Sequence, residues 1–141
     1  MGYITSRKDG LPRSARGMSN QTWYNMWSTK RWPYGELLRG DLLYWYEPPS
    51  KRIIWRTHIK KLERFRYSNK AAARRRIERK LGAVDPNERY YQERQEKGYC
   101  VAFKVGQVRK VRLSKPGGVR FDPLGWKRVT ESIAKKWLRA W

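Results

Sequence analysis

The segment from Arg52 to Tyr67 constrains the fold more than any other part of this sequence, because its side chains alternate in character with a period of two. Most odd positions are apolar or aromatic and most even positions are basic, with Ile54 and Leu62 as exceptions. Successive side chains of a β-strand point to opposite faces. The pattern therefore predicts one long strand with an apolar face and a basic face, and its length indicates a bulge or bend within it.

The other elements predict a mixed domain. Hairpin-like pairs of strands with helices between them indicate an α+β fold, with a small curved mixed sheet or pseudo-barrel and flanking helices. The length suits one core, and no internal repeat or linker divides the chain, so residues 1–141 are treated as one domain. We expect strands at 2–6, 42–46, 52–67 and 99–105, the last continued by or paired with 108–113, and helices at 19–29, 70–81, 86–97 and from Thr130 to Trp141.

Two of the expected helices are inferred from capping patterns. Ser19 is a candidate N-cap, and Trp23 and Trp27 then lie on one helical face. Asp85-Pro86-Asn87-Glu88 has the pattern of a capping box with proline at the first helical position. These signals predict helices that begin near residues 19 and 86.

The charge balance points to a polyanionic partner. The chain has 34 Lys and Arg against 12 Asp and Glu, a net charge of +22 in 141 residues. Such an excess repels itself in the compact state, and nucleic acid is the first candidate partner, ahead of an anionic membrane surface. No apolar run is long enough for a transmembrane helix, and the single cysteine, Cys100, is typical of a reducing compartment. We therefore expect a cytoplasmic protein without a membrane partner.

Residues typical of catalysis or metal binding are sparse. His58 is the single histidine, which leaves no paired-histidine metal site, and Cys100 lies in an apolar alternation typical of a buried thiol. A site built from Glu36, Asp41 and Glu47 stays open, although nothing in their spacing selects it. We expect no enzyme activity, no metal and no cofactor.

The basic stretch from Lys51 to Lys80 is the candidate backbone-binding surface. It combines the basic face of the long strand with an arginine-rich helix, and arginine forms bidentate contacts with phosphate. The alternative is a solvated face, which would leave these charges without acidic partners. The candidate residues are Arg52, Arg56, Lys60, Arg64, Arg66, Arg74, Arg75 and Arg76.

The eight tryptophans and nine tyrosines suggest core packing and base stacking. Trp23 and Trp55 are expected in the core. Trp32 and Tyr34 lie in a basic-flanked loop, and with Trp27 or Trp45 they form the best candidate for a base-stacking pocket. Tyr44 lies on the opposite strand face from Trp45.

One stretch resembles the PUA-like superfamily, nearest to EVE, YTH and ASCH-type domains. The similarity rests on a first strand ending in Thr5-Ser6, a helix with Trp23 and Trp27, and Leu37-Leu38-Arg39-Gly40-Asp41 leading into a strand and hairpin. The resemblance implies a curved sheet or pseudo-barrel. It also implies an aromatic cage for one modified base, with Trp27 as the cage tryptophan and Thr5 and Ser6 at the pocket floor. The candidate pocket residues are Thr5, Ser6, Trp27, Trp32, Tyr34, Tyr44 and Trp45.

The leading hypothesis is a nucleic-acid-binding module that recognises a modified, flipped base beside a basic backbone-binding face. Some members of the resembling families are specificity modules of modification-dependent restriction systems, so a separate catalytic domain or subunit is an implied partner. The sequence does not separate DNA from RNA. The alternatives are a structural RNA-binding protein without a base pocket, and a nuclease or other nucleic-acid enzyme.

Overall fold

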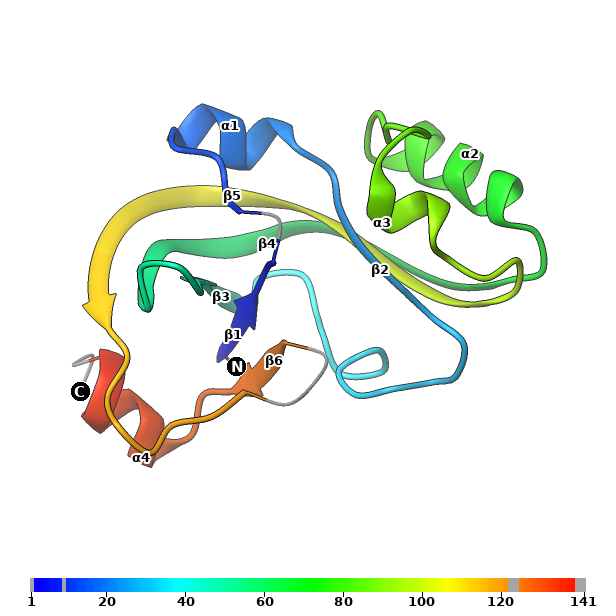
Figure 1. The fold of residues 1–141 in the computed structure, drawn as a ribbon. Helices are drawn as coiled ribbons and strands as arrows, with labels where there is room; N and C mark the ends of the chain where they lie inside the picture. Colours follow the sequence, from blue (N-terminus) through cyan, green and yellow to red (C-terminus); the bar gives the residue numbers. More distant parts are fainter. Residues whose placement is uncertain (1, 9, 122–124, 139–141) are drawn as a thin grey trace.

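The core of the protein is a single six-stranded mixed sheet that curls into a half-barrel (Figure 1). The computed structural model describes residues 2–8, 10–121 and 125–138. The strand order is β2-β5-β4-β3-β1-β6, in which β1 and β3 are parallel and all other neighbours antiparallel. The strands are β1 Gly2–Ser6, β2 Trp23–Trp27, β3 Leu42–Glu47, β4 Arg52–Tyr67, β5 Gly98–Ser114 and β6 Trp126–Arg128.

Short helices flank this sheet, which confirms the predicted α+β class. α2 and α3 lie together near one end of the β4–β5 ribbon, and α4 lies toward the other end (Figure 1). The helices are α1 Ala15–Asn20, α2 Lys70–Lys80, α3 Arg89–Gln92 and α4 Glu131–Ile133, which continues into a π-helical turn, Ala134–Leu138. In the described ranges, no helix is long and apolar enough to cross a membrane.

The predicted long strand is confirmed as β4, and the predicted irregularity takes the form of several bulges. Against β3, the pairing passes from Trp55 directly to Ile53, so Ile54 is an extra residue. Against β5, Lys60 is an extra residue between Ile59 and Lys61. Each extra residue reverses the alternation of faces along the strand. Single-period counting therefore gives the wrong face for half of β4.

Three hydrophobic clusters fill the two faces of the sheet. The first lies on the face that carries Trp45, here called the Trp45 face, and includes Trp23, Trp55, Phe103 and Trp126. On the opposite face, α2 and α3 cover a second cluster around Phe65 and Tyr67. The third cluster packs Trp137 of the π-helical turn against Ile4, Tyr44 and Tyr46. Because β3 alternates, Tyr44 and Trp45 belong to different clusters.

The predicted helix at 19–29 is wrong. Helix α1 ends at Asn20, and its N-cap is Ser14, whose side chain accepts a hydrogen bond from the Gly17 backbone N–H at 3.0 Å. Residues 23–27 form β2 and pair with β5 from Trp23–Phe103 to Trp27–Tyr99. All five residues of β2 are buried, so the strand shows no polar alternation, and two tryptophans four residues apart imitate a helical face.

The predicted helix at 86–97 is also too long, because only Arg89–Gln92 are helical. The Asp85 carboxylate accepts from the Asn87 backbone N–H at 2.9 Å, which forms a turn instead of a cap. The Glu88 carboxylate accepts from the Tyr24 hydroxyl at 2.8 Å and makes no cap. The closing helix begins as expected, capped by Thr130, and Trp141 lies outside the described residues.

Candidate nucleic-acid interface

The bulges of β4 distribute its basic residues over both faces, which corrects the predicted single basic stripe. Arg52 lies on the Trp45 face, because it follows the Ile54 bulge and pairs with Glu47. Arg56 lies on the opposite face beside Tyr44, whose hydroxyl accepts from the Arg56 Nε at 3.3 Å. Beyond the Lys60 bulge, Arg64 pairs with Val101 and Arg66 with Tyr99, which returns both to the Trp45 face.

The β4–β5 ribbon places like charges directly opposite each other. Arg56 pairs with Arg109, and Lys61 pairs with Lys104. The pKa of Lys104 is lowered, first by burial and then by Lys61 and Lys60. Directly opposed like charges destabilise an antiparallel pair, so this ribbon favours an external anion that would neutralise it.

Helix α2 continues this basic surface. Asn69 caps the helix by accepting from the Ala72 backbone N–H at 2.9 Å, and Ala73 and Ile77 are its buried residues. Of the predicted contacts, Arg75 is exposed, whereas Arg74 and Arg76 are half-buried against Tyr91 and Phe65 at 5.8 and 4.3 Å. Between described residues, a single ion pair involves β4, β5 or α2, namely Arg76–Glu63 at 3.8 Å.

The predicted base-pocket residues divide between the two faces. Trp27 and Trp45 belong to the cluster on the Trp45 face, and Trp32 and Tyr34 pack against it. Tyr34 meets Tyr99 edge to face at 5.4 Å, and burial raises the pKa of its hydroxyl. Tyr44 lies on the opposite face. Trp45 is fully buried, and its Nε1 donates to Thr57 Oγ1 at 2.9 Å.

Thr5 and Ser6 also separate, because they are adjacent in a strand. Thr5 pairs with Trp45 and with Trp126 on the two sides of β1, and its buried Oγ1 has no hydrogen-bond partner among the described residues. Ser6 pairs with Tyr46 and donates its backbone N–H to the Gly125 carbonyl at 2.7 Å. Of the two, only Thr5 directs its side chain toward the tryptophans.

Arg7 is a central residue of this face that the sequence analysis missed. Its guanidinium lies 5.8, 5.5 and 5.7 Å from the ring centres of Trp23, Trp45 and Trp126. It donates to Asn25 Oδ1 at 3.1 Å, and within the described part of the chain its Nε has no hydrogen-bond partner. Burial lowers the pKa of Arg7 to about 10. The alternation of Tyr3, Thr5 and Arg7 could have placed Arg7 on the buried face of the first strand. Its three tryptophan partners could not be predicted, because they lie on three separate strands.

Arg64 provides a second cation on the Trp45 face. Arg64 pairs with Val101 on β5, and Val101 pairs with Asn25 on β2. Arg64 therefore lies level with Asn25, which accepts the hydrogen bond from Arg7. The Arg64 guanidinium donates to the Leu37 carbonyl, and no described residue hydrogen-bonds to its Nε. Buried polar atoms in native proteins are rarely left unpaired. Thr5, Arg7 and Arg64 therefore each place one buried hydrogen-bonding atom on this face that no described residue satisfies.

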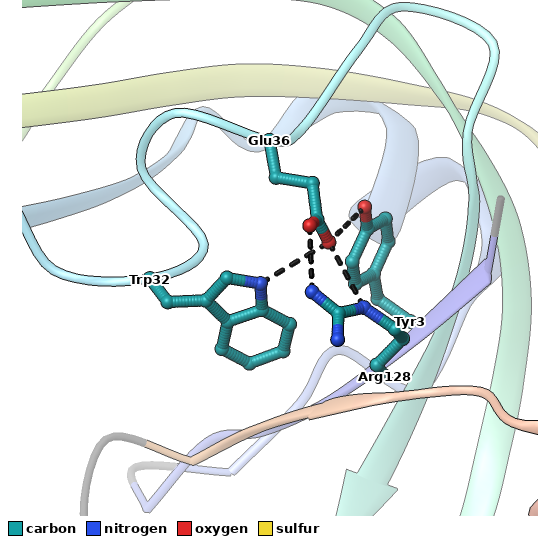
Figure 2. Close-up of polar contacts among 4 residues, drawn as sticks. All are labelled: Tyr3, Trp32, Glu36 and Arg128. Atoms are coloured by element: carbon teal, nitrogen blue, oxygen red, sulfur yellow. Dashed lines mark hydrogen bonds and ion pairs between the residues drawn. The ribbon is translucent and has the colours of Figure 1, made fainter.

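Glu36 organises the aromatic loop through a second network (Figure 2). Its carboxylate accepts from the Tyr3 hydroxyl at 2.7 Å and from Trp32 Nε1 at 3.1 Å, and it pairs with Arg128 at 2.6 Å. These donors, Arg128 first, lower the pKa of Glu36 to about 2. Arg128 also lies 5.1 Å from the Trp32 ring, so the network fixes Trp32 from its edge and from its face. The sequence analysis left open a site built from Glu36, Asp41 and Glu47. In the structure the Glu36 carboxylate is bound by Tyr3, Trp32 and Arg128, so it holds the aromatic loop in place.

Other reactive groups are isolated. Within residues 2–8, 10–121 and 125–138, no group of three or more His, Cys, Asp or Glu side chains is arranged to hold a metal ion. Cys100 is buried in the second cluster, and burial raises the pKa of its thiol to about 12.

The curled mixed sheet, with a parallel β1–β3 pair and helices at its ends, is a PUA-like fold, as the resemblance implied. Within that class it has the fold of the ASCH domain. The ASCH protein of Zymomonas mobilis superposes with a TM-score of 0.65 at 11% identity, covering 95% of this chain and 91% of that one. Two single-substitution variants of that protein superpose with TM-scores of 0.66 and 0.59, at 11% and 13% identity, and cover 96% of this chain and 94% and 92% of theirs. No family model and no curated protein matches the sequence.

Proposed function

We propose that this chain is a nucleic-acid-binding module that contacts the phosphate backbone through the β4–β5 ribbon and α2. The carrying observation is the pair of opposed like charges on that ribbon, Arg56–Arg109 and Lys61–Lys104. Phosphates neutralise such residues and release counterions, which makes affinity strongly dependent on salt. The ASCH-type fold is consistent with this role, although the charge pattern of this chain is the main support.

We further propose that one base, unpaired or flipped, is accepted on the Trp45 face. Trp27, Trp32 and Tyr34 would supply aromatic surface, and Arg7 and Thr5 would supply hydrogen bonds to the base edge. Stacking of one base on an aromatic side chain is worth about 1–3 kcal/mol, comparable to the cost of flipping. The finer hypothesis is that this base is chemically modified and is held in an aromatic cage, as the resemblance to EVE and YTH domains suggests. In that case the chain would supply the specificity, and a separate domain or subunit would supply the catalytic activity.

Fluorescence polarisation with matched single-stranded and duplex oligonucleotides, DNA and RNA, tests the backbone proposal. The observed affinity should fall steeply as salt rises, and the same titrations with modified and unmodified bases test the cage. Equal affinity for both forms would remove the modified-base hypothesis and leave a protein that coats nucleic acid. Absence of binding at low salt would contradict the proposed function as a whole.

Thr5→Val tests the base site without disturbing the fold. Because Thr5 Oγ1 has no partner in the described ranges, its loss should leave thermal stability unchanged or higher. Loss of its hydrogen bond to a base, about 0.5–1.5 kcal/mol, should lower affinity roughly 2- to 12-fold. Thr57→Val is the matched control. The Thr57 hydroxyl bridges Trp45 Nε1 and the Leu43 carbonyl, so its removal should destabilise the protein. Unchanged affinity of Thr5→Val would remove Thr5 from the site.

The proposed role is binding without catalysis. Prolonged incubation of the same oligonucleotides with protein and divalent metal, analysed on denaturing gels, tests this part. Metal-dependent cleavage that is lost in Glu36→Gln would contradict it and would support the nuclease alternative.

A further inference from the structure

A separate hollow of about 360 Å³ lies at the end of the ribbon remote from α2, which follows the other end of β4. The loop at Pro12 and Arg13 borders it on one side, and the turn after Glu47 borders it on another. The start of β4 and the last part of β5 complete its walls. Its volume is in the range of pockets that bind small organic ligands. None of the residues predicted from the sequence for the base pocket lines it.

One wall of the hollow is apolar and held in place. Trp55 is 3% exposed, and its Nε1 donates to the Pro12 carbonyl at 2.9 Å, which fixes the indole ring. Ile54, the extra residue of the β4 bulge, packs against the same cluster as Trp55 and adds aliphatic surface. A flat apolar ligand could pack against this wall.

The rim of the hollow is cationic. Arg52 enters it from β4, and Lys110 and Arg112 enter it from β5. Lys110 pairs directly with Trp55, which places its side chain on the same face of the sheet as the indole. No ion pair to Arg52, Lys110 or Arg112 occurs among the described side chains. Three cations beside an apolar wall match a ligand that combines an anionic group with a flat ring.

Glu47 is the residue in the hollow that would select one kind of base over another. It is 5% exposed, yet it lines the hollow, and its one ionic partner in the described part of the chain is Arg13 at 2.7 Å. The Arg13 side chain is 75% exposed, so this partner comes from the solvent side. A carboxylate repels phosphate and accepts hydrogen bonds from N–H groups of a base. Guanine presents two adjacent N–H donors on its pairing edge, whereas uracil presents one.

We propose that this hollow is a nucleotide subsite that prefers guanine. The Glu47 carboxylate accepts from the guanine N–H groups, the Trp55 wall packs against the ring, and Arg52, Lys110 and Arg112 hold the phosphate. Arg13, which pairs with Glu47, borders the subsite from the solvent side. The inference rests on the proposed nucleic-acid function and adds to it a second contact point, at the opposite end of the ribbon from α2.

Isothermal titration calorimetry of the full chain with the four nucleoside 5′-monophosphates and with inorganic phosphate tests the proposal. The guanine nucleotide should bind at least 10-fold more tightly than the uracil nucleotide. Glu47→Gln should remove most of this preference, because a hydrogen bond to a charged group contributes about a factor of 10 or more. Arg112→Ala should weaken all four nucleotides alike, and Arg89→Ala, which removes an exposed arginine of α3, should change none.

Equal affinity for the four nucleotides, or binding no tighter than that of inorganic phosphate, would overturn the guanine subsite. The guanine preference is measured on the unsubstituted chain, so the inference can be refuted even if the Glu47→Gln variant fails to fold. Salt-dependent binding of oligonucleotides without guanine preference would overturn this inference and leave the proposed function standing. Guanine-selective binding of mononucleotides without oligonucleotide binding would support the subsite and overturn the proposed function.

Discussion

Replacing Arg109 with threonine should stabilise the free protein and weaken its binding to nucleic acid. Arg109 is exposed and lies directly opposite Arg56, so the substitution removes a like-charge pair and introduces a residue that favours strands. A cross-strand pair contributes about 0.2–1 kcal/mol. For a chain of this length, the midpoint of thermal unfolding should rise by about 1–4 °C.

The same substitution should remove about one phosphate contact. The slope of log affinity against log salt should become shallower by about 0.9 for duplex DNA or about 0.7 for a single strand. Circular dichroism melts give the first quantity, and polarisation titrations at several salt concentrations give the second. The gain in midpoint should be larger at low salt, because salt screens exposed charges.

Arg120→Thr is the matched control, since Arg120 is exposed and lies outside the strands. It removes the same charge without relieving a cross-strand pair. A midpoint for Arg109→Thr at or below that of Arg120→Thr would refute the argument from opposed charges. An unchanged salt slope would remove Arg109 from the interface.

Three further predictions concern the fold around the two sites. The pKa of Glu36 is about 2 in the folded protein against an ordinary 4.5, so its stabilising contribution is present above about pH 4.5 and is lost as the pH falls toward 2. The denaturation midpoint of Glu36→Gln should therefore depend less on pH over that range than that of the unsubstituted protein. Cys100, with a thiol pKa of about 12, should react with a thiol reagent at pH 8 only after denaturation, and fast labelling of the native protein would contradict its burial. Gly125→Ala should lower stability by more than about 1 kcal/mol, because φ is +75° and the added Cβ would lie 2.8 Å from the Ser6 carbonyl oxygen; an unchanged melt would contradict the described turn.

The sequence predicted those elements whose two faces differ in polarity. β4 and α2 are amphipathic and were located nearly to the residue. β3 is buried from Leu43 to Glu47 and was located instead by the turn residues on either side of it, Gly40-Asp41 and Pro48-Pro49. β2 was missed because it is buried on both faces, so its periodicity carried no information. A bulge or bend was expected in β4, but neither the number of bulges nor their positions, since an extra residue such as Lys60 has no distinctive chemistry in the sequence.

The site was predictable only in part for the same physical reason. The basic residues and the aromatic residues of the loop can be recognised from the sequence alone. Trp27, Trp32 and Tyr34 do lie together at the cluster on the Trp45 face. The environment of Arg7 depends on the packing of Trp23, Trp45 and Trp126, which lie on strands far apart in the chain. Such a contact becomes visible only when the sheet order is known.

The bulge at Lys60 also limits how the β4–β5 ribbon can change during evolution. Deleting that one residue would exchange the faces of everything from Lys61 to Tyr67, placing Phe65 and Tyr67 against the tryptophans and Arg64 and Arg66 beneath α2. Loops in this fold can vary in length, whereas the ribbon can gain or lose residues only in compensating steps. Alignments of divergent relatives should therefore fix the bulges first, because a gap misplaced by one residue would match each core position with a surface position.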